Sequence, residues 1–332
     1  MRKLMFVTLS AVLIMTLASC GNNNTESQPD SIEADASTEN QTVENTIYTA
    51  NDMQSDLSQN VGDNSSESVN ILPSDFDEAL FKDFEYDFDA DQGGIVITKY
   101  IGNSSEINIP DTVKVIGREA FSGYKELIEF NIPDSVTKIG WYAFEGCTGI
   151  TKITIPDSVT EIGIGAFRGC SGLMEITIPN SVTNIGRNAF ENCTGLTSFI
   201  IPDSVLSLEP NFLKGCNGLS SIIIPDSVIE IRIEAFENCF WLTDITIGNS
   251  VVEIGNSAFK GCHGLASVAI PNSVELIGQF AFSECYNLID ISIDNSNCVI
   301  QQNAFKDTTP SEESKNKLHE INPLLQFGNQ RR

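Results

Sequence analysis

The sequence contains few of the residues and motifs on which enzymes and metal sites usually depend. Only two histidines, His263 and His319, occur in 332 residues, and neither stands at a metal-binding or catalytic spacing. The chain has no Gly-x-Ser-x-Gly, His-Glu-x-x-His or phosphate-binding glycine loop. Its nine cysteines include no Cys-x-x-Cys pair, the usual local signature of zinc or redox chemistry. These absences predict a protein that is not an enzyme and that uses no metal or other cofactor.

Basic residues are also scarce. Lysine and arginine number 19 against 45 aspartates and glutamates, which gives a net charge of −26. Between Gly21 and Asp91 there are eighteen acidic residues and one basic residue, Lys82. Proteins that bind nucleic acid need clusters of lysine and arginine to meet its phosphates, so nucleic acid is excluded as a partner.

What the sequence does contain is one 23-residue phrase, repeated in phase. The proline of Ile-Pro-Asp-Ser-Val recurs at Pro110, Pro133, Pro156, Pro179, Pro202, Pro225 and Pro271, with Gly248 and Asp294 in the two remaining copies. Eleven residues after this slot come Phe121, Phe144, Phe167, Phe190, Leu213, Phe236, Phe259, Phe282 and Phe305. A fixed period of this length predicts an α/β repeat solenoid of the leucine-rich-repeat type, with about nine coils and parallel strands on its concave face.

The local pattern of one copy indicates how a coil is built. Leu173, Ile176 and Ile178 alternate with polar residues, which is typical of a short strand with one buried face. The proline then ends the strand, and Asn-Ser or Asp-Ser turns the chain through hydrogen bonds from side chain to backbone. Ile185 is expected to point back into the core, and Gly186 is expected to permit a tight bend. Successive coils would pair their strands at ~4.8 Å.

The N-terminus has the pattern of an export signal. Two basic residues precede an apolar run from Leu4 to Leu17, which is too short to span a membrane and predicts a signal peptide. The sequence Leu17-Ala18-Ser19-Cys20 resembles the lipobox of bacterial lipoproteins. That resemblance implies cleavage before Cys20 and attachment of a lipid anchor to its thiol. An ordinary signal peptide followed by a chance cysteine is the alternative.

The segment that follows is too polar to fold by itself, and further composition changes mark the remaining boundaries. An aromatic cluster after residue 74 predicts a cap with a short helix over 74–84 and a hairpin of Phe84–Phe88 with Ile95–Tyr100. Thr309-Pro310-Ser311-Glu312 predicts a capping box for a helix that ends near Ile321. The predicted organisation is a lipoprotein signal peptide at 1–19, a disordered acidic stalk at 20–73, an N-terminal cap at 74–94, the solenoid at 95–308, and a C-terminal capping helix and tail at 309–332.

Two features could indicate chemistry but also have structural interpretations. Seven cysteines share one slot of the repeat, and we expect them to form a buried column that packs as small hydrophobic residues: Cys147, Cys170, Cys193, Cys216, Cys239, Cys262 and Cys285. Asp87, Asp89 and Asp91 match the start of a calcium-binding loop. An EF-hand would require a glycine in place of Gln92 and a glutamate in place of Thr98, so the turn of the hairpin is the other interpretation.

Recognition is therefore expected on the surface of the coils. The outward residue of each strand is mostly polar, in the series Asn131, Thr154, Thr177, Ile200, Ile223, Thr246, Ala269 and Ser292. Two aliphatic neighbours interrupt this series, and aromatic residues occupy variable positions nearby. Exposed apolar and aromatic groups often mark contact sites. The predicted partner-binding residues are Ile200, Ile223, Trp241, Phe240, Trp141 and Tyr142. Packing between the edges of coils is the alternative for each of them.

The repeat phrase Ile-Pro-Asp-Ser-Val-Thr-x-Ile-Gly-x-x-Ala-Phe-x-x-Cys-x-x-Leu, over residues 95–305, resembles the BspA-type leucine-rich repeats of bacterial surface proteins. This resemblance implies a protein of the bacterial cell surface that binds proteins, as an adhesin for host or bacterial partners. Together with the lipobox, it implies an exported lipoprotein that is anchored to the membrane. It supplies no motif of ligand-binding residues. The alternative function is a cell-envelope scaffold or a glycan-binding accessory protein without catalytic activity.

Overall fold

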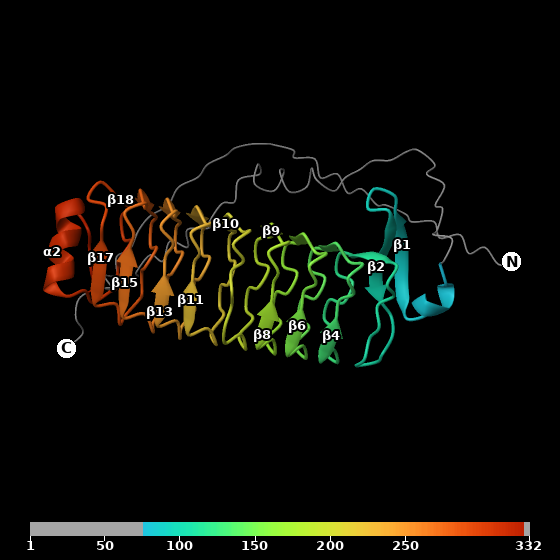
Figure 1. Ribbon diagram of the computed structural model, residues 1–332. Coiled ribbons are helices and arrows are strands. Elements are labelled where there is room, and N and C mark those ends of the chain that lie inside the picture. The colour runs from blue at the N-terminus through green and yellow to red at the C-terminus, as the bar shows by residue number, and fades with distance from the viewer. Residues whose placement is uncertain (1–75, 329–332) are drawn as a thin grey trace, which may run out of the picture. The chain divides into compact units, whose positions relative to one another are not determined.

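Alternating apolar residues before the proline slot form the first of two rows of parallel strands. The computed structural model describes residues 76–328, so the predicted signal peptide (1–19), Cys20 and the stalk (20–73) lie outside the described residues. The strands of this first row are β4 (Glu129–Asn131), β6 (Lys152–Thr154), β8 (Glu175–Thr177), β11 (Ser221–Ile223), β13 (Asp244–Thr246), β15 (Ser267–Ile270) and β17 (Asp290–Ile293). Their register advances by one 23-residue repeat per coil, as in Ile153 opposite Ile176. The predicted leucine-rich-repeat solenoid with parallel strands is confirmed (Figure 1).

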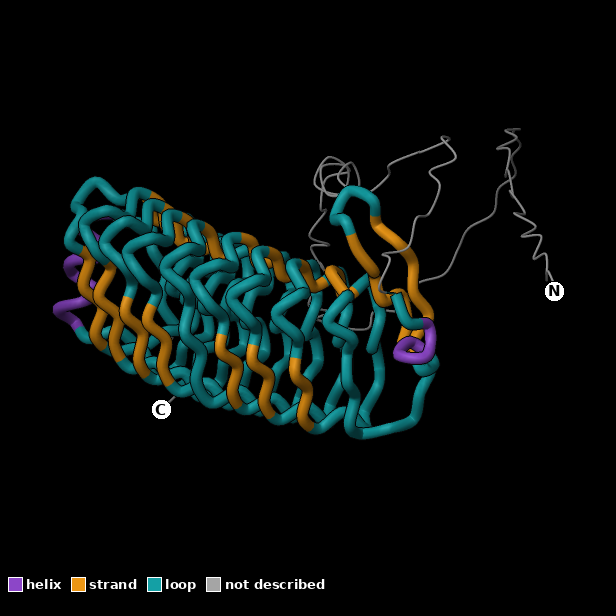
Figure 2. The backbone as a smooth tube through the Cα atoms, turned by 45° about the vertical axis from the view of Figure 1, so that its right-hand side comes forward, coloured by secondary structure: helices purple, strands orange, loops and turns teal. Residues whose placement is uncertain are grey.

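A second row of parallel strands follows the Pro-Asp-Ser turn. It comprises β3 (Val113–Ile116), β5 (Lys138–Ile139), β7 (Glu161–Ile162), β9 (Asn184–Ile185), β10 (Ser207–Leu208), β12 (Glu230–Ile231), β14 (Glu253–Ile254), β16 (Leu276–Ile277) and β18 (Val299–Ile300). Figure 2 shows both rows as orange segments on separate faces of the coil stack. Ile185 is buried, as predicted from the repeat, but the pattern of the repeat did not predict this second sheet.

The remainder of each described coil is made of turns, which stand where an α/β repeat would have a helix. Each coil has two left-handed positions, such as Asn188 (φ 60°) and Asn192 (φ 59°). The second of these slots is glycine in five coils, which suits a left-handed backbone. Gly186 opens the expected bend, since the N–H of Ala189 donates to its carbonyl at 3.2 Å, and it has a second role. A Cβ atom there would lie 2.6 Å from the backbone nitrogen of Ile164, so the glycine permits close packing of adjacent coils.

The phenylalanines of the repeat form two stacks of parallel rings along the core. One stack contains Phe121, Phe144, Phe167 and Phe190, and the other contains Phe236, Phe259, Phe282 and Phe305. Adjacent ring centroids are 5.0–5.5 Å apart and adjacent ring planes lie within 8° of each other. The core is therefore continuous along each stack, and every coil buries the face of its neighbour.

The coil between the two stacks is irregular. Leu213 occupies the phenylalanine slot, while Phe212 occupies the slot that other coils fill with alanine. Phe212 packs edge to face against Phe190 and Phe199, with centroid distances of 6.0 and 5.5 Å. No strand is formed at residues 198–200, and β9 and β10 belong to different sheets. Two large rings in one coil thus replace the regular stacking, and both rows of strands are interrupted there.

The N-terminal end is covered by an aromatic cluster and an antiparallel hairpin. The hairpin pairs β1 (Phe84–Asp89) with β2 (Gly94–Tyr100), and β2 continues in parallel with β3. The helix expected over 74–84 is, in its described part, the short 3-10 helix η1 (Glu78–Phe81). It is limited to one turn because the hairpin strand begins at Phe84, three residues after its end. Phe81 of this helix stacks on Phe76, with their centroids 5.1 Å apart.

The C-terminal end is covered by the helix α2 (Glu312–Ile321), whose predicted end is confirmed. Its N-cap is Ser311, so the predicted cap at Thr309 was two residues early; the Thr309 hydroxyl instead donates to the carbonyl of Tyr286. At the end of the stack, side chains of this segment form hydrogen bonds with the backbone of the last strand of each sheet. Ser314 Oγ accepts the backbone N–H of Ile291 at 3.0 Å, and Asn322 Nδ2 donates to the carbonyl of Ile300 at 2.8 Å.

Ser314→Ala is expected to lower the free energy of unfolding by ~1–3 kcal/mol, because the buried N–H of Ile291 would lose its acceptor. Urea denaturation followed by circular dichroism measures this change. Asn316→Ala, at an exposed position of the same helix, serves as the control and should leave stability nearly unchanged. Equal stability of the two variants would contradict the capping role of Ser314.

Candidate functional site

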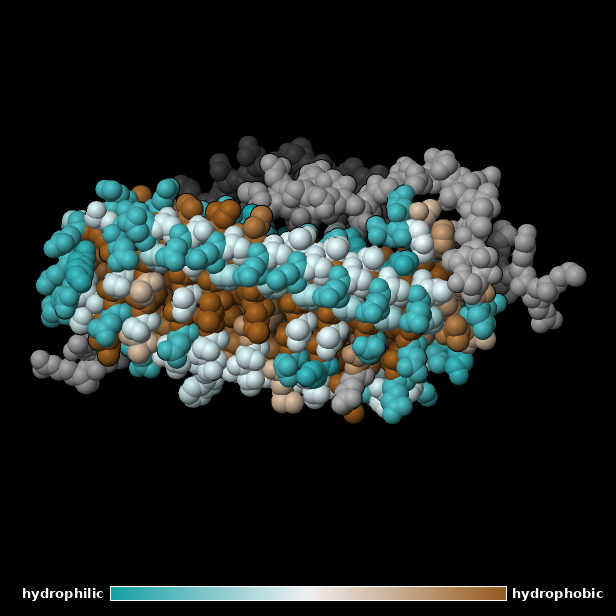
Figure 3. Space-filling view, viewed as in Figure 1, coloured by the Kyte–Doolittle hydropathy of each residue, from teal (hydrophilic) through white to brown (hydrophobic). Residues whose placement is uncertain are grey.

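Two predicted recognition residues stand fully outward on the face of the first sheet. Ile200 and Ile223 occupy equivalent positions of adjacent coils and are 79% and 68% exposed. Ile223 lies in β11 and is paired with Thr246 of β13, whereas Ile200 lies in the irregular coil. Apolar surface is visible near the middle of the face that carries β8 and β11 (Figure 3). The structure therefore places these two side chains where a partner can reach them.

Trp241 and Phe240 lie on the turn that precedes β13. Trp241 is 70% exposed, and Phe240 is also exposed. Trp241 precedes Thr246, the cross-strand partner of Ile223, by five residues. The predicted patch therefore has an aliphatic part, which includes Ile223 at the end of β11, and an aromatic part on the turn before β13.

Phe240 belongs to a stack of three rings that the sequence analysis missed. His263 lies between Phe240 and Tyr286, and each neighbouring centroid is 4.8 Å away. All three residues directly follow a cysteine of the repeated column, and this shared slot was the signal that could have revealed them. His263 covers one ring face of Phe240 and one ring face of Tyr286, so the stack links three successive coils.

Trp141 and Tyr142 are only half-exposed, and both pack against the next coil. A Cβ atom at Gly163 would lie 2.8 Å from the Trp141 ring, and one at Gly165 would lie 2.4 Å from the Tyr142 ring. The two glycines thus leave room for these aromatic side chains. Packing between coils, the alternative interpretation for both residues, accounts for their positions.

The seven repeated cysteines are buried free thiols. Each Sγ donates to the carbonyl of the residue 26 positions earlier, as Cys170 does to Phe144 at 3.0 Å. Burial raises the pKa of Cys193 and Cys239 to about 12, so both thiols stay protonated at neutral pH. A buried, protonated thiol is a poor nucleophile and a poor metal ligand. The column is part of the core, as the sequence analysis predicted.

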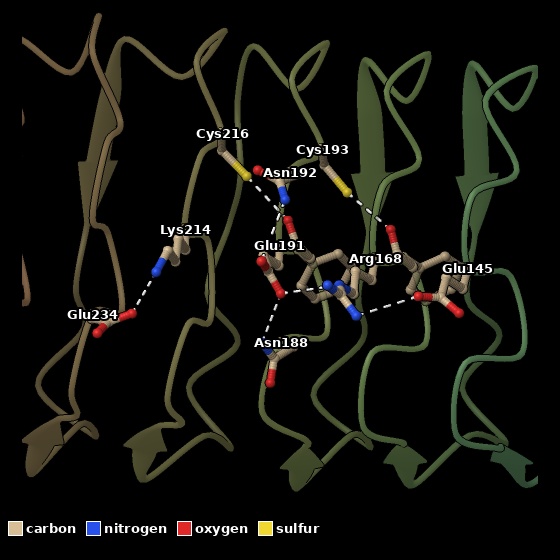
Figure 4. A network of polar contacts seen from close by, with 11 residues as sticks. Glu145, Arg168, Asn188, Glu191, Asn192, Cys193, Lys214, Cys216 and Glu234 are labelled. Atoms are coloured by element: carbon tan, nitrogen blue, oxygen red, sulfur yellow. Dashed lines mark hydrogen bonds and ion pairs between the residues drawn. The ribbon is translucent and has the colours of Figure 1, made fainter. Parts of the chain in front are cut away.

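Alternating charges occupy the slot that follows the core phenylalanine (Figure 4). Arg168 contacts Glu145 at 3.4 Å and Glu191 at 3.1 Å on its two sides. Further along, Lys214 forms ion pairs with Glu234 and Glu237. Burial lowers the pKa of Lys214, but its hydrogen bonds to the two carboxylates outweigh burial and raise the pKa above its ordinary value. The network links neighbouring coils, and each of its basic side chains already pairs with carboxylates of the same chain.

The aspartates of the calcium-loop pattern lie at the hairpin. Asp89 Oδ1 accepts the backbone N–H groups of Asp91 and Gln92 at 2.9 and 3.1 Å, which fixes the turn between β1 and β2. Across residues 76–328, no group of three or more His, Cys, Asp or Glu side chains is arranged to hold a metal ion. None of the helices in this part of the chain has the length and apolarity needed to cross a membrane.

The geometry defines the class of protein. Coils of 23 residues, two rows of parallel strands, a core of stacked phenylalanines and a cap at each end make a leucine-rich-repeat solenoid. A family model described as "BspA type Leucine rich repeat region" matches six copies over residues 99–220 and 208–315. The chain belongs to this family. Leucine-rich-repeat families generally bind proteins and are generally non-catalytic.

Three solved structures of bacterial proteins show similarity to this chain. A leucine-rich repeat protein from Bacteroides ovatus is 29% identical, with 71% of each chain covered and a TM-score of 0.56. A leucine-rich cell surface protein from Faecalibacterium prausnitzii is 25% identical, covering 72% of this chain and 96% of its own, with a TM-score of 0.36. A leucine-rich repeat protein from T. pallidum is 23% identical, covering 75% of this chain and 96% of its own, with a TM-score of 0.42. No curated protein matches the chain.

Proposed function

We propose that this protein is an exported lipoprotein of the bacterial cell surface whose solenoid binds proteins, as an adhesin for host or bacterial surface proteins. The observation that carries the proposal is the pair Ile200 and Ile223, two fully outward aliphatic side chains in a column that is otherwise mainly polar. Burying an isoleucine side chain contributes ~1.5–3 kcal/mol, so the pair can supply much of the core of a small interface. Trp241 would extend this contact along the coil.

The N-terminal sequence supplies the proposed route to the surface. Residues 1–19 direct export, and the thiol of Cys20 receives the lipid anchor. Acyl chains contribute ~0.8 kcal/mol per buried methylene, so two or more chains hold a protein firmly on a membrane. The acidic stalk at 20–73 then separates the folded domain from the lipid surface. In this organisation, residues 74–94 and 309–332 protect the two ends of the solenoid at 95–308.

Ile223→Asp tests the proposed binding face. We expect the variant to fold normally, because the side chain is solvent-exposed, and to bind its partner at least 10-fold more weakly. Biotinylated surface proteins from host cells and bacteria are captured on the immobilised full chain, and surface plasmon resonance then measures the affinity of each captured protein. Thr177→Asp, at the equivalent position of β8, is the matched control. Equal affinities for both variants and the wild-type chain would reject this face.

The alternative function is a scaffold or glycan-binding accessory protein of the cell envelope. The exposed ring of Trp241, with the carboxylate-bearing Asp244 three residues later, is the observation that favours it. Binding to purified envelope polysaccharide that survives Ile223→Asp would support this alternative over the adhesin.

A further inference from the structure

The second sheet has an aliphatic stripe on its outer face that the proposed function does not use. Leu206, Ile229 and Val252 occupy the same slot of three successive coils and are 59%, 45% and 37% exposed. Backbone hydrogen bonds place them side by side. The N–H of Ile229 donates to the carbonyl of Leu206, and the N–H of Val252 donates to that of Ile229, each at 2.8 Å. Earlier coils place Thr160 and Thr183 in this slot. The apolar character is therefore confined to one part of the solenoid.

Carboxylates surround the aliphatic stripe. These are Asp203 and Asp226 from the turn before it, Glu230 and Glu253 directly after it, and Glu275, whose N–H bonds to the carbonyl of Val252. Arg232 is engaged by Glu209 and Glu230 at 3.5 and 3.3 Å. Asp203, Glu253 and Glu275 form no ion pair with any side chain of the described region. This contrasts with the charge network of Figure 4, in which cations alternate with carboxylates.

We propose that the aliphatic stripe docks an amphipathic helix of a partner protein whose apolar side is bordered by lysine or arginine. Successive coils are about 5 Å apart, since the rings of Phe236 and Phe259 are separated by 5.0 Å. One turn of an α-helix rises 5.4 Å. A helix along the stack therefore brings apolar residues at i, i+4 and i+7 over Leu206, Ile229 and Val252 in turn. Its basic residues then meet the unpaired carboxylates on either side.

Charge selects this occupant over others. A second copy of the chain would bring the same acidic border against itself, which is repulsive. Anionic lipid headgroups and nucleic acid are repelled for the same reason. The stripe is also separate from the face of Ile200 and Ile223, because the Pro-Asp-Ser turn stands between the two sheets. The inference does not depend on the proposed adhesin function.

Three fluorescein-labelled 18-residue peptides test the inference by fluorescence anisotropy with the full chain. The first is a helix with leucines at i, i+4 and i+7 between lysines, the second is a shuffled sequence of the same composition, and the third replaces lysine with glutamate. We expect only the first peptide to bind. Ile229→Asp should weaken that binding at least 10-fold, and Glu253→Gln with Glu275→Gln should weaken it about 3-fold and reduce its salt dependence.

Matched variants locate the binding site. Thr160→Asp, in the same slot three coils earlier, should bind the first peptide as the wild-type chain does. Thermal melts check that each variant is folded. Equal binding of the shuffled or glutamate peptide, or wild-type affinity in Ile229→Asp, would overturn the inference. Loss of peptide binding in Ile223→Asp alone would also overturn it, because it would place the peptide on the first sheet, while the proposed adhesin face would stand.

Discussion

Raising the pH from 9 to 11 is expected to unfold the protein, because the buried thiol column must stay protonated. Burial raises the pKa of Cys147, Cys193, Cys239 and Cys285 from the ordinary 9.0 to about 12, and that of the other three column thiols well above 9.0. In the unfolded chain the same thiols lose their protons near pH 9. The folded state therefore binds more protons than the unfolded state in this range. Its stability is complete below pH 9 and falls as the pH rises toward 12.

The cumulative effect is large. At pH 10 each thiol of this kind destabilises the folded state by roughly 1 kcal/mol, and the seven together by several kcal/mol. The total stability of a typical domain is only ~5–15 kcal/mol. Urea denaturation at a series of pH values measures the slope. A variant with Cys193→Ala and Cys239→Ala should be less stable at pH 7. Between pH 7 and pH 10, however, its free energy of unfolding should fall by roughly 2 kcal/mol less than that of the wild-type chain. An unchanged slope would show that tyrosines and lysines, rather than the thiols, cause the pH dependence.

Phe190→Ala is expected to lower the free energy of unfolding by ~3–5 kcal/mol, because it opens a cavity in the core. The Phe190 ring is fully buried and stacks on Phe167 at 5.5 Å. Its other neighbours are Phe199 and Phe212, at centroid distances of 4.9 and 6.0 Å. Phe190 thus joins the regular stack to the irregular coil, and little around it can move to fill the space.

Calorimetry or urea denaturation measures this loss. Phe240→Ala is the control, since it removes an exposed ring two coils further along the solenoid and should cost less than ~1.5 kcal/mol. A melting temperature of Phe190→Ala within one degree of the wild-type value would contradict the role of the stacked rings as the core.

The fold could be predicted because the repeat constrains every coil in the same way. The alternation around Ile176 and Ile178 predicts the first sheet, and the fixed period predicts its parallel register. The second sheet was missed because its strands are mostly two residues long, as in Asn184–Ile185, and such a stretch contains no alternation to detect. The helix cap was misplaced because Thr309 and Ser311 are both suitable residues. The tertiary contact between Thr309 and Tyr286, which the sequence does not reveal, decides between them.

The candidate sites were less predictable than the fold. Ile200 and Ile223 were found because they break an outward polar column in a predicted strand. The aliphatic stripe of Leu206, Ile229 and Val252 was not found, because without the second sheet its slot could not be recognised as outward. The ring stack around His263 can be predicted only when it is known that residues in the same position of successive coils lie side by side. Core packing imposes the same residue types on the buried positions of every coil, but it does not constrain the surface positions. The sequence therefore indicates binding residues on the surface only indirectly.

Protease treatment of intact bacterial cells that produce the protein tests the proposed surface function most directly. The acidic stalk at 20–73 is the expected cleavage segment, and the account predicts release of a folded fragment that contains residues 76–328 without lysis. An antibody against the solenoid detects the fragment, and a cytoplasmic marker that stays intact confirms that the cells did not break. Protection of the chain until lysis would contradict surface display, exclude the adhesin, and leave a scaffold inside the cell envelope as the function.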